Sequence, residues 1–175
     1  MSVLPVRTMG DPVLRERARP VANFDKALRR LAADMVETMY DSNGVGLAAP
    51  QVGVSGRMFV FDDGETGPMV VVNPELYDHE GEQDGEEGCL SLPGIYFNVK
   101  RAMKVKVRGS DVDGRPIELE GEGLLARIFQ HENDHIDGIL FIDRLSEETR
   151  REAMKLLREQ ELGLVPQEQR ASRAL

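Results

Sequence analysis

Two histidines with a glutamate beside the first are the residues whose types and spacing most clearly indicate chemistry. Residues 131–135 read His-Glu-Asn-Asp-His. In an α-helix, residues i and i+4 share a face, so His131 and His135 can reach one metal ion. Glu132 lies about 100° round the helix from His131, which suits a proton acceptor better than a third ligand. The motif therefore predicts a metal site with its own base, rather than separate histidines satisfied by hydrogen bonds.

The residues around this motif favour a helix. An apolar run precedes it, and one helical face carries residues at i, i+4, i+7 and i+11, namely Leu124, Ile128, His131 and His135. Asp137 and Gly138 predict the end of the helix, because glycine readily takes the left-handed conformation.

The ion needs a third ligand from elsewhere in the chain. Catalytic sites usually combine three protein ligands with one position open to water. Cys89 is the only cysteine and lies among glycines and a proline in residues 86–94, which predicts a turn or a short exposed strand. Its thiolate would complete a set of two histidines and one cysteine. The alternative for this fragment alone is a small buried apolar residue.

Residues 44–51 form a run of small residues, Gly-Val-Gly-Leu-Ala-Ala-Pro-Gln. Its two glycines allow the backbone to approach a ligand closely, although a packed turn explains them equally well. A nucleotide loop is disfavoured, because no third glycine or lysine follows and Pro50 interrupts any helix that could face a phosphate. Beside a hydrolytic metal centre, the Gln51 amide could donate to a developing oxyanion.

Together, these three segments resemble the signatures of bacterial-type peptide deformylases. The family has a Gly-x-Gly-Leu-Ala-Ala-x-Gln loop, a Glu-Gly-Cys-Leu-Ser strand and a His-Glu-x-Asp-His helix, which match residues 44–51, 87–91 and 131–135 in the same order. Residues 10–14 and 137–141 also match, and the resemblance covers roughly residues 1–160. Three motifs in the right order are far more specific than any one of them.

The resemblance implies an enzyme that hydrolyses the N-formyl group from the formylmethionine of new polypeptides. It implies that Cys89, His131 and His135 hold a divalent ion that lowers the pKa of its water. It also implies that Glu132 moves the proton, while the Gln51 amide and the Leu90 backbone N–H stabilise the oxyanion. The residues expected to bind the substrate are Gly44, Val45, Gly46, Leu124, Arg127 and Ile128. Of these, Leu124 and Ile128 could equally be ordinary residues of the hydrophobic core, and Arg127 would contribute its alkyl stem to the methionine pocket.

Ligand chemistry and family resemblance favour different ions. A soft thiolate with two imidazoles suits zinc. The resemblance implies ferrous iron (Fe2+), with zinc (Zn2+) or nickel (Ni2+) as replacements.

Three other functions share part of this pattern. A zinc endopeptidase would normally take its third ligand from a downstream His or Glu rather than an upstream Cys. A thiol hydrolase would use Cys89 as the nucleophile. A closed structural metal site would need a fourth ligand and would leave Glu132 idle.

Composition agrees with a small cytoplasmic enzyme. The 175 residues, 41% of them hydrophobic, predict one domain with one core. No apolar run is long enough to span a bilayer, so no membrane association is expected. The single cysteine favours a reducing compartment, and the net charge of -9 argues against general nucleic-acid binding.

The pattern predicts an α+β fold with mostly antiparallel sheets around a central helix that carries the metal-binding motif. Helices are expected at 24–40 and 146–162, and strands at 58–61, 70–72, 104–107 and 117–119, with a hairpin turn at 113–114. A solvated loop is expected at 78–87. Residues 1–163 would form one catalytic domain and residues 164–175 a flexible tail. The C-terminal helix has no net attraction for ribosomal RNA, so any ribosome association would be weak.

Overall fold

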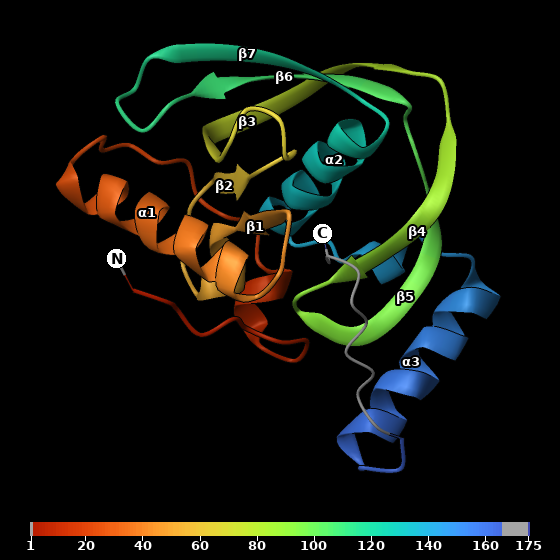
Figure 1. Cartoon of the computed structure of the whole chain (residues 1–175). Coiled ribbons are helices and arrows are strands. Elements are labelled where there is room, and N and C mark those ends of the chain that lie inside the picture. The colour runs from red at the N-terminus through yellow and green to blue at the C-terminus, as the bar shows by residue number, and fades with distance from the viewer. Residues whose placement is uncertain (1, 166–174) are drawn as a thin grey trace.

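In the computed structural model, antiparallel strands enclose one central helix, α2 (Figure 1), and the structure describes residues 2–165 and 175. The helices are α1 (Lys26–Asp41), α2 (Leu124–Ile136) and α3 (Glu147–Glu161), and the short 3-10 helices are η1 (Pro12–Arg15), η2 (Ala49–Val52) and η3 (Phe141–Arg144). The strands are β1 (Gly46–Ala48), β2 (Met58–Phe61), β3 (Met69–Glu80), β4 (Gln83–Cys89), β5 (Leu92–Arg101), β6 (Lys104–Ser110) and β7 (Pro116–Glu122).

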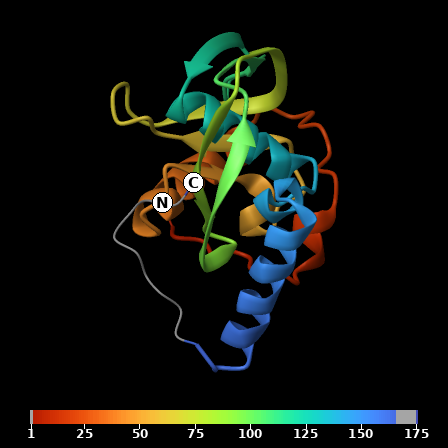
Figure 2. The ribbon, with the colours of Figure 1, turned by 90° about the vertical axis from the view of Figure 1, so that its right-hand side faces the viewer.

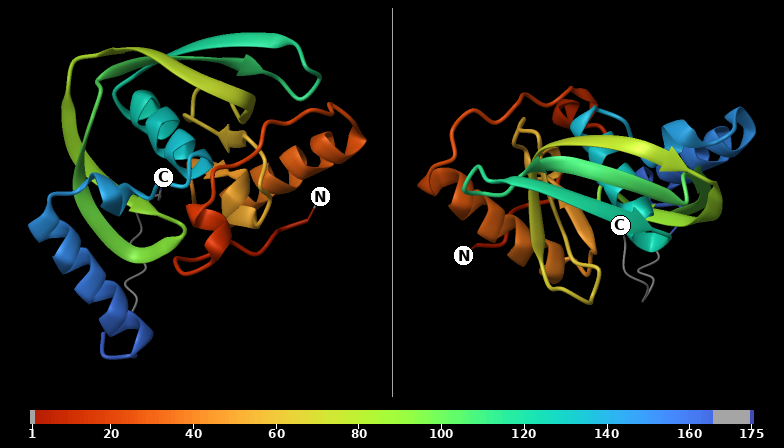
Figure 3. Two further views of the ribbon diagram at one scale, coloured as in Figure 1. Left: turned by 180° about the vertical axis from the view of Figure 1, so that it is seen from behind. Right: turned by 90° about the horizontal axis from the view of Figure 1, so that it is seen from above.

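The strands form two antiparallel sheets. One has the order β1-β2-β3-β6-β7, and the other is the β4-β5 hairpin. Figure 3 shows from behind that β4 and β5 curve round one side of α2, while β6 and β7 lie across another side. Helix α3 packs by one face on the β4-β5 side and extends beyond the strands (Figure 2). The predicted α+β class, with a motif-bearing helix at its centre, is confirmed.

Strand β2 explains how the sheet holds a helix on each face. Successive side chains of a strand point to opposite faces. Phe59 and Phe61 therefore pack with α2, where the Phe61 and Phe129 rings meet edge to face at 5.1 Å. Met58 and Val60 belong to the other core cluster, beside α1. Each side chain fully buried in this way stabilises the fold by about 1.5–3 kcal/mol. A four-residue apolar strand is thus buried on both faces.

Glycine residues set both ends of α2. Gly123 precedes the helix at φ 60°, and Gly138 follows it at φ 76°. A Cβ on Gly138 would also lie 2.7 Å from the Arg15 backbone oxygen. The predicted end of the helix at Asp137 and Gly138 is therefore confirmed. At this end, the last turn of α2, which carries His135, lies close to the N-terminal segment.

Most predicted elements are present, and the strands expected at 70–72, 104–107 and 117–119 are longer than predicted, as β3, β6 and β7. The helices expected at 24–40 and 146–162 are α1 and α3, the strand at 58–61 is β2, and the turn at 113–114 joins β6 to β7. No helix among the described residues is long and apolar enough to cross a membrane. The predicted tail lies mostly outside the described residues, although Leu175 is described and buried.

The solvated loop predicted at 78–87 is wrong. Its first residues end β3, and most of the rest belongs to β4, which pairs along its length with β5. Acidic side chains alternate between the two faces of β4, so Asp84 and Glu86 are exposed while Glu87 points inward and is buried. The run of negative charge concealed this alternation.

Candidate active site

The three predicted metal ligands meet in the interior. Helix α2 brings His131 and His135 together on one face, and β4 ends at Cys89 beside them. The Cys89 Sγ lies 3.2 Å from His135 Nε2, which lies 3.3 Å from His131 Nε2. All three ligand atoms are within 4.8 Å of one another. Two segments more than 40 residues apart therefore converge on one point.

An irregularity in the β4-β5 pairing aims the cysteine. The register shifts between Gly88 and Cys89, a feature that bends a strand and turns a side chain. The Cys89 Sγ accepts a hydrogen bond from the Ser91 backbone N–H at 3.4 Å. Cys89 is 3% exposed, which corrects the prediction of an exposed strand.

The donor set fits a divalent ion. Ordinary bonds of about 2.0–2.3 Å in a tetrahedron would separate two nitrogen ligands by roughly 3.3 Å and nitrogen from sulfur by roughly 3.5 Å. The observed separations of 3.3 Å and 3.2 Å are close to these values. Among the described His, Cys, Asp and Glu residues, this group contains three ligands and no fourth. That count favours an open site over a closed structural one.

Glu87 fixes the orientation of His131. The His131 Nδ1 lies 2.7 Å from Glu87 Oε1, an arrangement in which the ring donates its Nδ1 proton and leaves Nε2 free. Burial opposes a charged ring, but hydrogen bonds to Cys89 and Glu87 raise the pKa of His131 to about 10. Burial lowers the pKa of His135. One histidine thus has an anionic partner, whereas the His135 Nδ1 has no hydrogen-bond partner among the described groups.

Glu132 is a buried carboxyl group without a hydrogen-bond partner among the described residues. Burial raises the pKa of Glu132 to about 7. A Cβ on Gly46 would lie only 2.4 Å from Glu132 Oε1, so the absence of a side chain at Gly46 makes room for this carboxyl group. A buried carboxyl group with a pKa near neutrality can both take up and release a proton at working pH.

The Gln51 amide is held beside the ligands. Its Oε1 accepts from the Ala48 backbone N–H at 2.9 Å, which directs its Nε2 toward Ser91 Oγ at 3.2 Å and Cys89 Sγ at 3.7 Å. The next residue after the cysteine, Leu90, is half-buried and packs with the core cluster beside α1.

The predicted substrate-binding residues divide into three groups. Gly44, Val45 and Gly46 are buried, with Gly44 beside Leu90 and Gly46 beside Glu132, and Ile128 belongs with Val45 to the core cluster around α2. Leu124 is 58% exposed, and its role in a pocket stays a prediction. Arg127 is buried, but its charged end turns toward Glu87.

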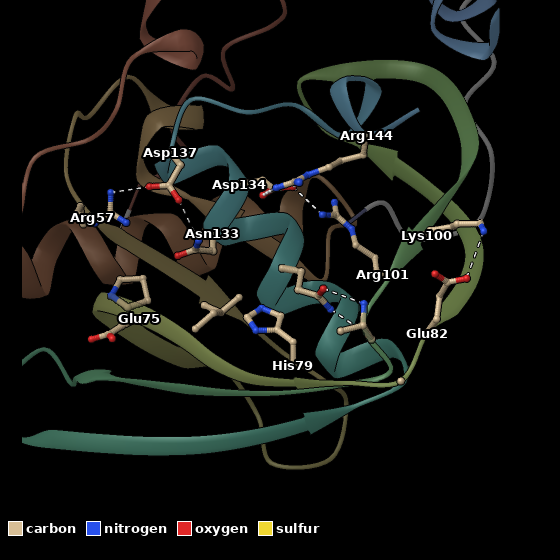
Figure 4. Close-up of a pocket in the computed structure, with 15 residues that line it drawn as sticks. Arg57, Glu75, His79, Glu82, Lys100, Arg101, Asn133, Asp134, Asp137 and Arg144 are labelled. Carbon is tan, nitrogen blue, oxygen red and sulfur yellow. Dashed lines mark hydrogen bonds and ion pairs between the residues drawn. The ribbon is translucent and has the colours of Figure 1, made fainter. Parts of the chain in front are cut away.

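A group of charged residues behind the site had no role in the interpretation of the sequence. Arg101 donates to Glu87 through Nε and NH2, each at 2.9 Å, and through NH1 to Asp134 at 2.6 Å. Arg144 also binds Asp134. Arg101, Asp134 and Arg144 line a cavity of about 560 Å³ on the other side of α2 (Figure 4). The available signal for this group was Arg101 itself, a charged residue that lies at an inward-facing position of β5.

Comparisons with known proteins give a consistent result. A family model described as polypeptide deformylase matches residues 3–151. A peptide deformylase of Acidothermus cellulolyticus is 56% identical over 162 residues, which cover 92% of this chain and 89% of that relative. One of Parafrankia sp. is 53% identical over 167 residues, with 95% and 91% covered.

Solved structures agree with the sequence relatives. The crystal structure of a peptide deformylase from Legionella pneumophila has a TM-score of 0.87 at 46% identity and covers 94% of this chain and 99% of its own. That of peptide deformylase from Thermus thermophilus has a TM-score of 0.87 at 49% identity, with 92% and 96% covered.

Proposed function

Because the chain belongs to the polypeptide deformylase family, we propose that the buried cluster around His131 is the site at which it works. The chain is a hydrolase that removes the N-formyl group from nascent polypeptides, and its family depends on a metal ion. The observation that carries the site proposal is the convergence of Cys89, His131 and His135 beside Glu132, a buried carboxyl group with no partner among the described residues.

Cys89, His131 and His135 would hold one divalent ion. Such an ion would act as a Lewis acid, which lowers the pKa of water toward neutrality and polarises a carbonyl group. The Glu87 carboxylate keeps the His131 ring in the tautomer with a free Nε2, as partners of metal-bound histidines commonly do.

Glu132 acts as the general base and then as the general acid. Its carboxylate takes a proton from the attacking water and delivers it to the amine that leaves the formyl carbon. Proton transfer of this kind typically contributes 10²- to 10⁴-fold to the rate. The pKa near 7 suits both steps, since the group changes its protonation state easily at neutral pH.

Gln51 and Leu90 stabilise the oxyanion that develops on the formyl group. The Gln51 Nε2 is oriented by the hydrogen bond that its own oxygen accepts, so this donor is fixed before substrate arrives. The Leu90 backbone N–H follows directly after the cysteine ligand. Loss of one such donor costs on the order of 3 kcal/mol in the transition state.

The methionine side chain of the substrate would contact Val45 and Ile128. Both belong to the same apolar cluster, and Gly44 and Gly46 leave space for the substrate backbone. Leu124 would then lie at the exposed rim and Arg127 would present its alkyl stem.

Ferrous iron is the ion we propose, with zinc and nickel as replacements. The thiolate and imidazole ligands accept all three. Metal analysis of protein purified without oxygen, paired with its specific activity, tests this choice. Full activity with stoichiometric zinc and no iron would overturn it.

The test of function is formate release from a formyl-Met tripeptide by metal-loaded enzyme, with the N-acetyl peptide as a control. We expect formate from the first peptide and no cleavage of internal bonds in either. Internal cleavage would indicate an endopeptidase instead. Activity that resists chelators but is lost on alkylation would indicate a Cys89 thiol hydrolase.

The cellular setting is also a proposal. We expect a cytoplasmic enzyme, since a reducing compartment preserves the thiolate ligand. Residues 1–163 would form the catalytic domain. Ribosome association through α3 would be weak, because several of its basic residues pair with acidic ones, as Arg151 does with Glu147 and Lys155 with Glu159.

A further inference from the structure

Arg127 is a buried cation whose charged group has no role in the reaction described so far. It lies on α2 one turn before His131, and only 4% of it is exposed. Its NH1 lies 2.5 Å from Glu87 Oε2 and 2.8 Å from the Val99 backbone oxygen. Its NH2 lies 3.2 Å from Gln83 Oε1. The side chain that the sequence assigned to an apolar pocket thus directs its charge into β4 and β5.

The Glu87 carboxylate receives four donors. Its Oε1 accepts from His131 Nδ1 at 2.7 Å and Arg101 NH2 at 2.9 Å. Its Oε2 accepts from Arg101 Nε at 2.9 Å and Arg127 NH1 at 2.5 Å. A carboxylate offers about four lone-pair sites, so Glu87 is saturated. Removal of any one donor leaves part of a buried charge unsatisfied.

Arg101 alone cannot satisfy the Glu87 carboxylate, because it also binds the carboxylate of Asp134. Its NH1 binds Asp134 at 2.6 Å, and Figure 4 shows Arg101 and Arg144 both directed at Asp134. Arg127 is the second buried guanidinium on Glu87, and it approaches from α2 while Arg101 approaches from the end of β5. Donors from two different elements fix the carboxylate more firmly than one.

We propose that Arg127 is a positioning residue of the metal site, which holds Glu87 in the orientation that directs His131 toward the ion. This inference rests on the proposed function, since it assumes that His131 is a ligand. Arg127 acts through Glu87 and does not touch the reacting atoms. Partners of this kind typically change metal affinity by 10- to 100-fold when they are lost.

The surrounding backbone is shaped for a guanidinium. A Cβ on Gly85 would lie 3.1 Å from the Arg127 NH2, so the bare glycine leaves room for the planar group. The Val99 oxygen and the Gln83 side chain take up its other donors. A lysine has the charge but not the fork that reaches several acceptors at once.

The test compares Arg127→Met with Arg108→Met. Methionine keeps an unbranched apolar stem and removes the charge. Arg108 binds Glu75 through two nitrogens, at 2.7 Å and 3.1 Å, on the exposed face of β6 and serves as a matched arginine-glutamate control. The zinc dissociation constant is measured by chelator competition. We expect Arg127→Met to weaken zinc binding about 10-fold or more, with Arg127→Lys between it and wild type. Arg108→Met should change binding by less than about twofold.

A second readout separates positioning from packing. In zinc-loaded protein with 15N-labelled histidine, the His131 Nδ1 proton should exchange with solvent at least about 10-fold faster in Arg127→Met, because the Glu87 acceptor is no longer fixed. Zinc affinity and proton exchange equal to those of Arg108→Met would overturn the proposal. Wild-type protein that bound no zinc through His131 would instead overturn the proposed function, so the two failures are distinguishable.

A milder variant covers the case in which Arg127→Met does not fold. Gly85→Ala keeps every charge and presses a methyl group against the Arg127 NH2. We expect zinc affinity to fall about 3- to 10-fold. Wild-type affinity in Gly85→Ala would contradict the proposal.

Discussion

Helices α2 and α3 are similar in length but differ in almost every other respect. Of the 13 residues of α2, nine are buried, and they include both histidines and Glu132. Of the 15 residues of α3, only Ala153 is buried. Strands surround α2, whereas α3 projects from the body with one face packed on the β4-β5 side (Figures 1 and 2).

This difference indicates that α2 carries the groups that do the chemistry, whereas α3 contributes only to the stability of the fold. On α2, two of the polar side chains that do chemistry depend on other segments, since Glu87 orients His131 and Gly46 makes room for Glu132. On α3, side chains such as Arg151 pair within the helix surface. Changes in α2 or its partners should therefore affect the reaction, and changes in α3 should affect at most the stability.

The largest effect is expected at the cysteine ligand. Cys89→Ala leaves two imidazoles, which bind a divalent ion weakly, so metal affinity and kcat/KM should each fall by at least about 10²-fold. Lys155→Ala on α3 is the control and should leave both unchanged. Full metal occupancy with wild-type activity would remove Cys89 from the site.

A large effect is also expected from one methyl group near Glu132. In Gly46→Ala the new Cβ would lie 2.4 Å from Glu132 Oε1, so the carboxyl group must move. We expect kcat/KM to fall about 10²-fold with metal content retained, since general base catalysis contributes on that scale. Gly56→Ala, where no atom lies closer than 3.7 Å to the new Cβ, is the matched control. Equal activity of the two variants would show that Glu132 does not need its present position.

Substrate preference gives the next test. The apolar residues Val45 and Ile128 should favour formyl-Met and formyl-norleucine peptides over formyl-Ala. Each missing methylene costs about 1 kcal/mol in an apolar pocket, so formyl-Ala should have roughly 10²-fold lower kcat/KM. Similar kcat/KM values for formyl-Ala and formyl-Met would show that these residues do not form the pocket.

Changes in α3 should have the smallest effect on the reaction. Ala153→Asp buries a carboxylate and should lower the free energy of unfolding by about 2–3 kcal/mol, measured by urea denaturation. Its kcat, measured where the protein is folded, should match wild type. Arg151→Ala on the exposed face should change stability by less than about 0.5 kcal/mol. A kcat loss in the folded Ala153→Asp protein would place α3 within the catalytic unit.

The sequence could predict what local patterns determine. The spacing of His131 and His135 and the glycine after the helix were sufficient to place α2 and two ligands. The alternation along β4 was hidden, because the inward Glu87 and the outward Asp84 and Glu86 are all acidic. Burial separates them, and burial depends on the pairing with β5.

Apart from the meeting of Cys89 with the two histidines, contacts between distant segments could not be predicted from the sequence. Arg101 and Asp134 are 33 residues apart and meet only because β5 curves round α2. Arg127 was assigned to an apolar pocket by its position on the helix, yet its guanidinium binds a carboxylate of β4. A helical position gives the direction of a side chain but not the charge that it meets.

The central claim is that Glu132 moves the proton and is not a metal ligand. The direct test is formate release by Glu132→Gln at matched metal content. Glutamine keeps the shape of the side chain but cannot accept the proton, so the variant should hold one ion per chain and lose at least about 10²-fold in kcat. A variant that holds its metal and keeps wild-type kcat, or one that loses the metal, would contradict the account.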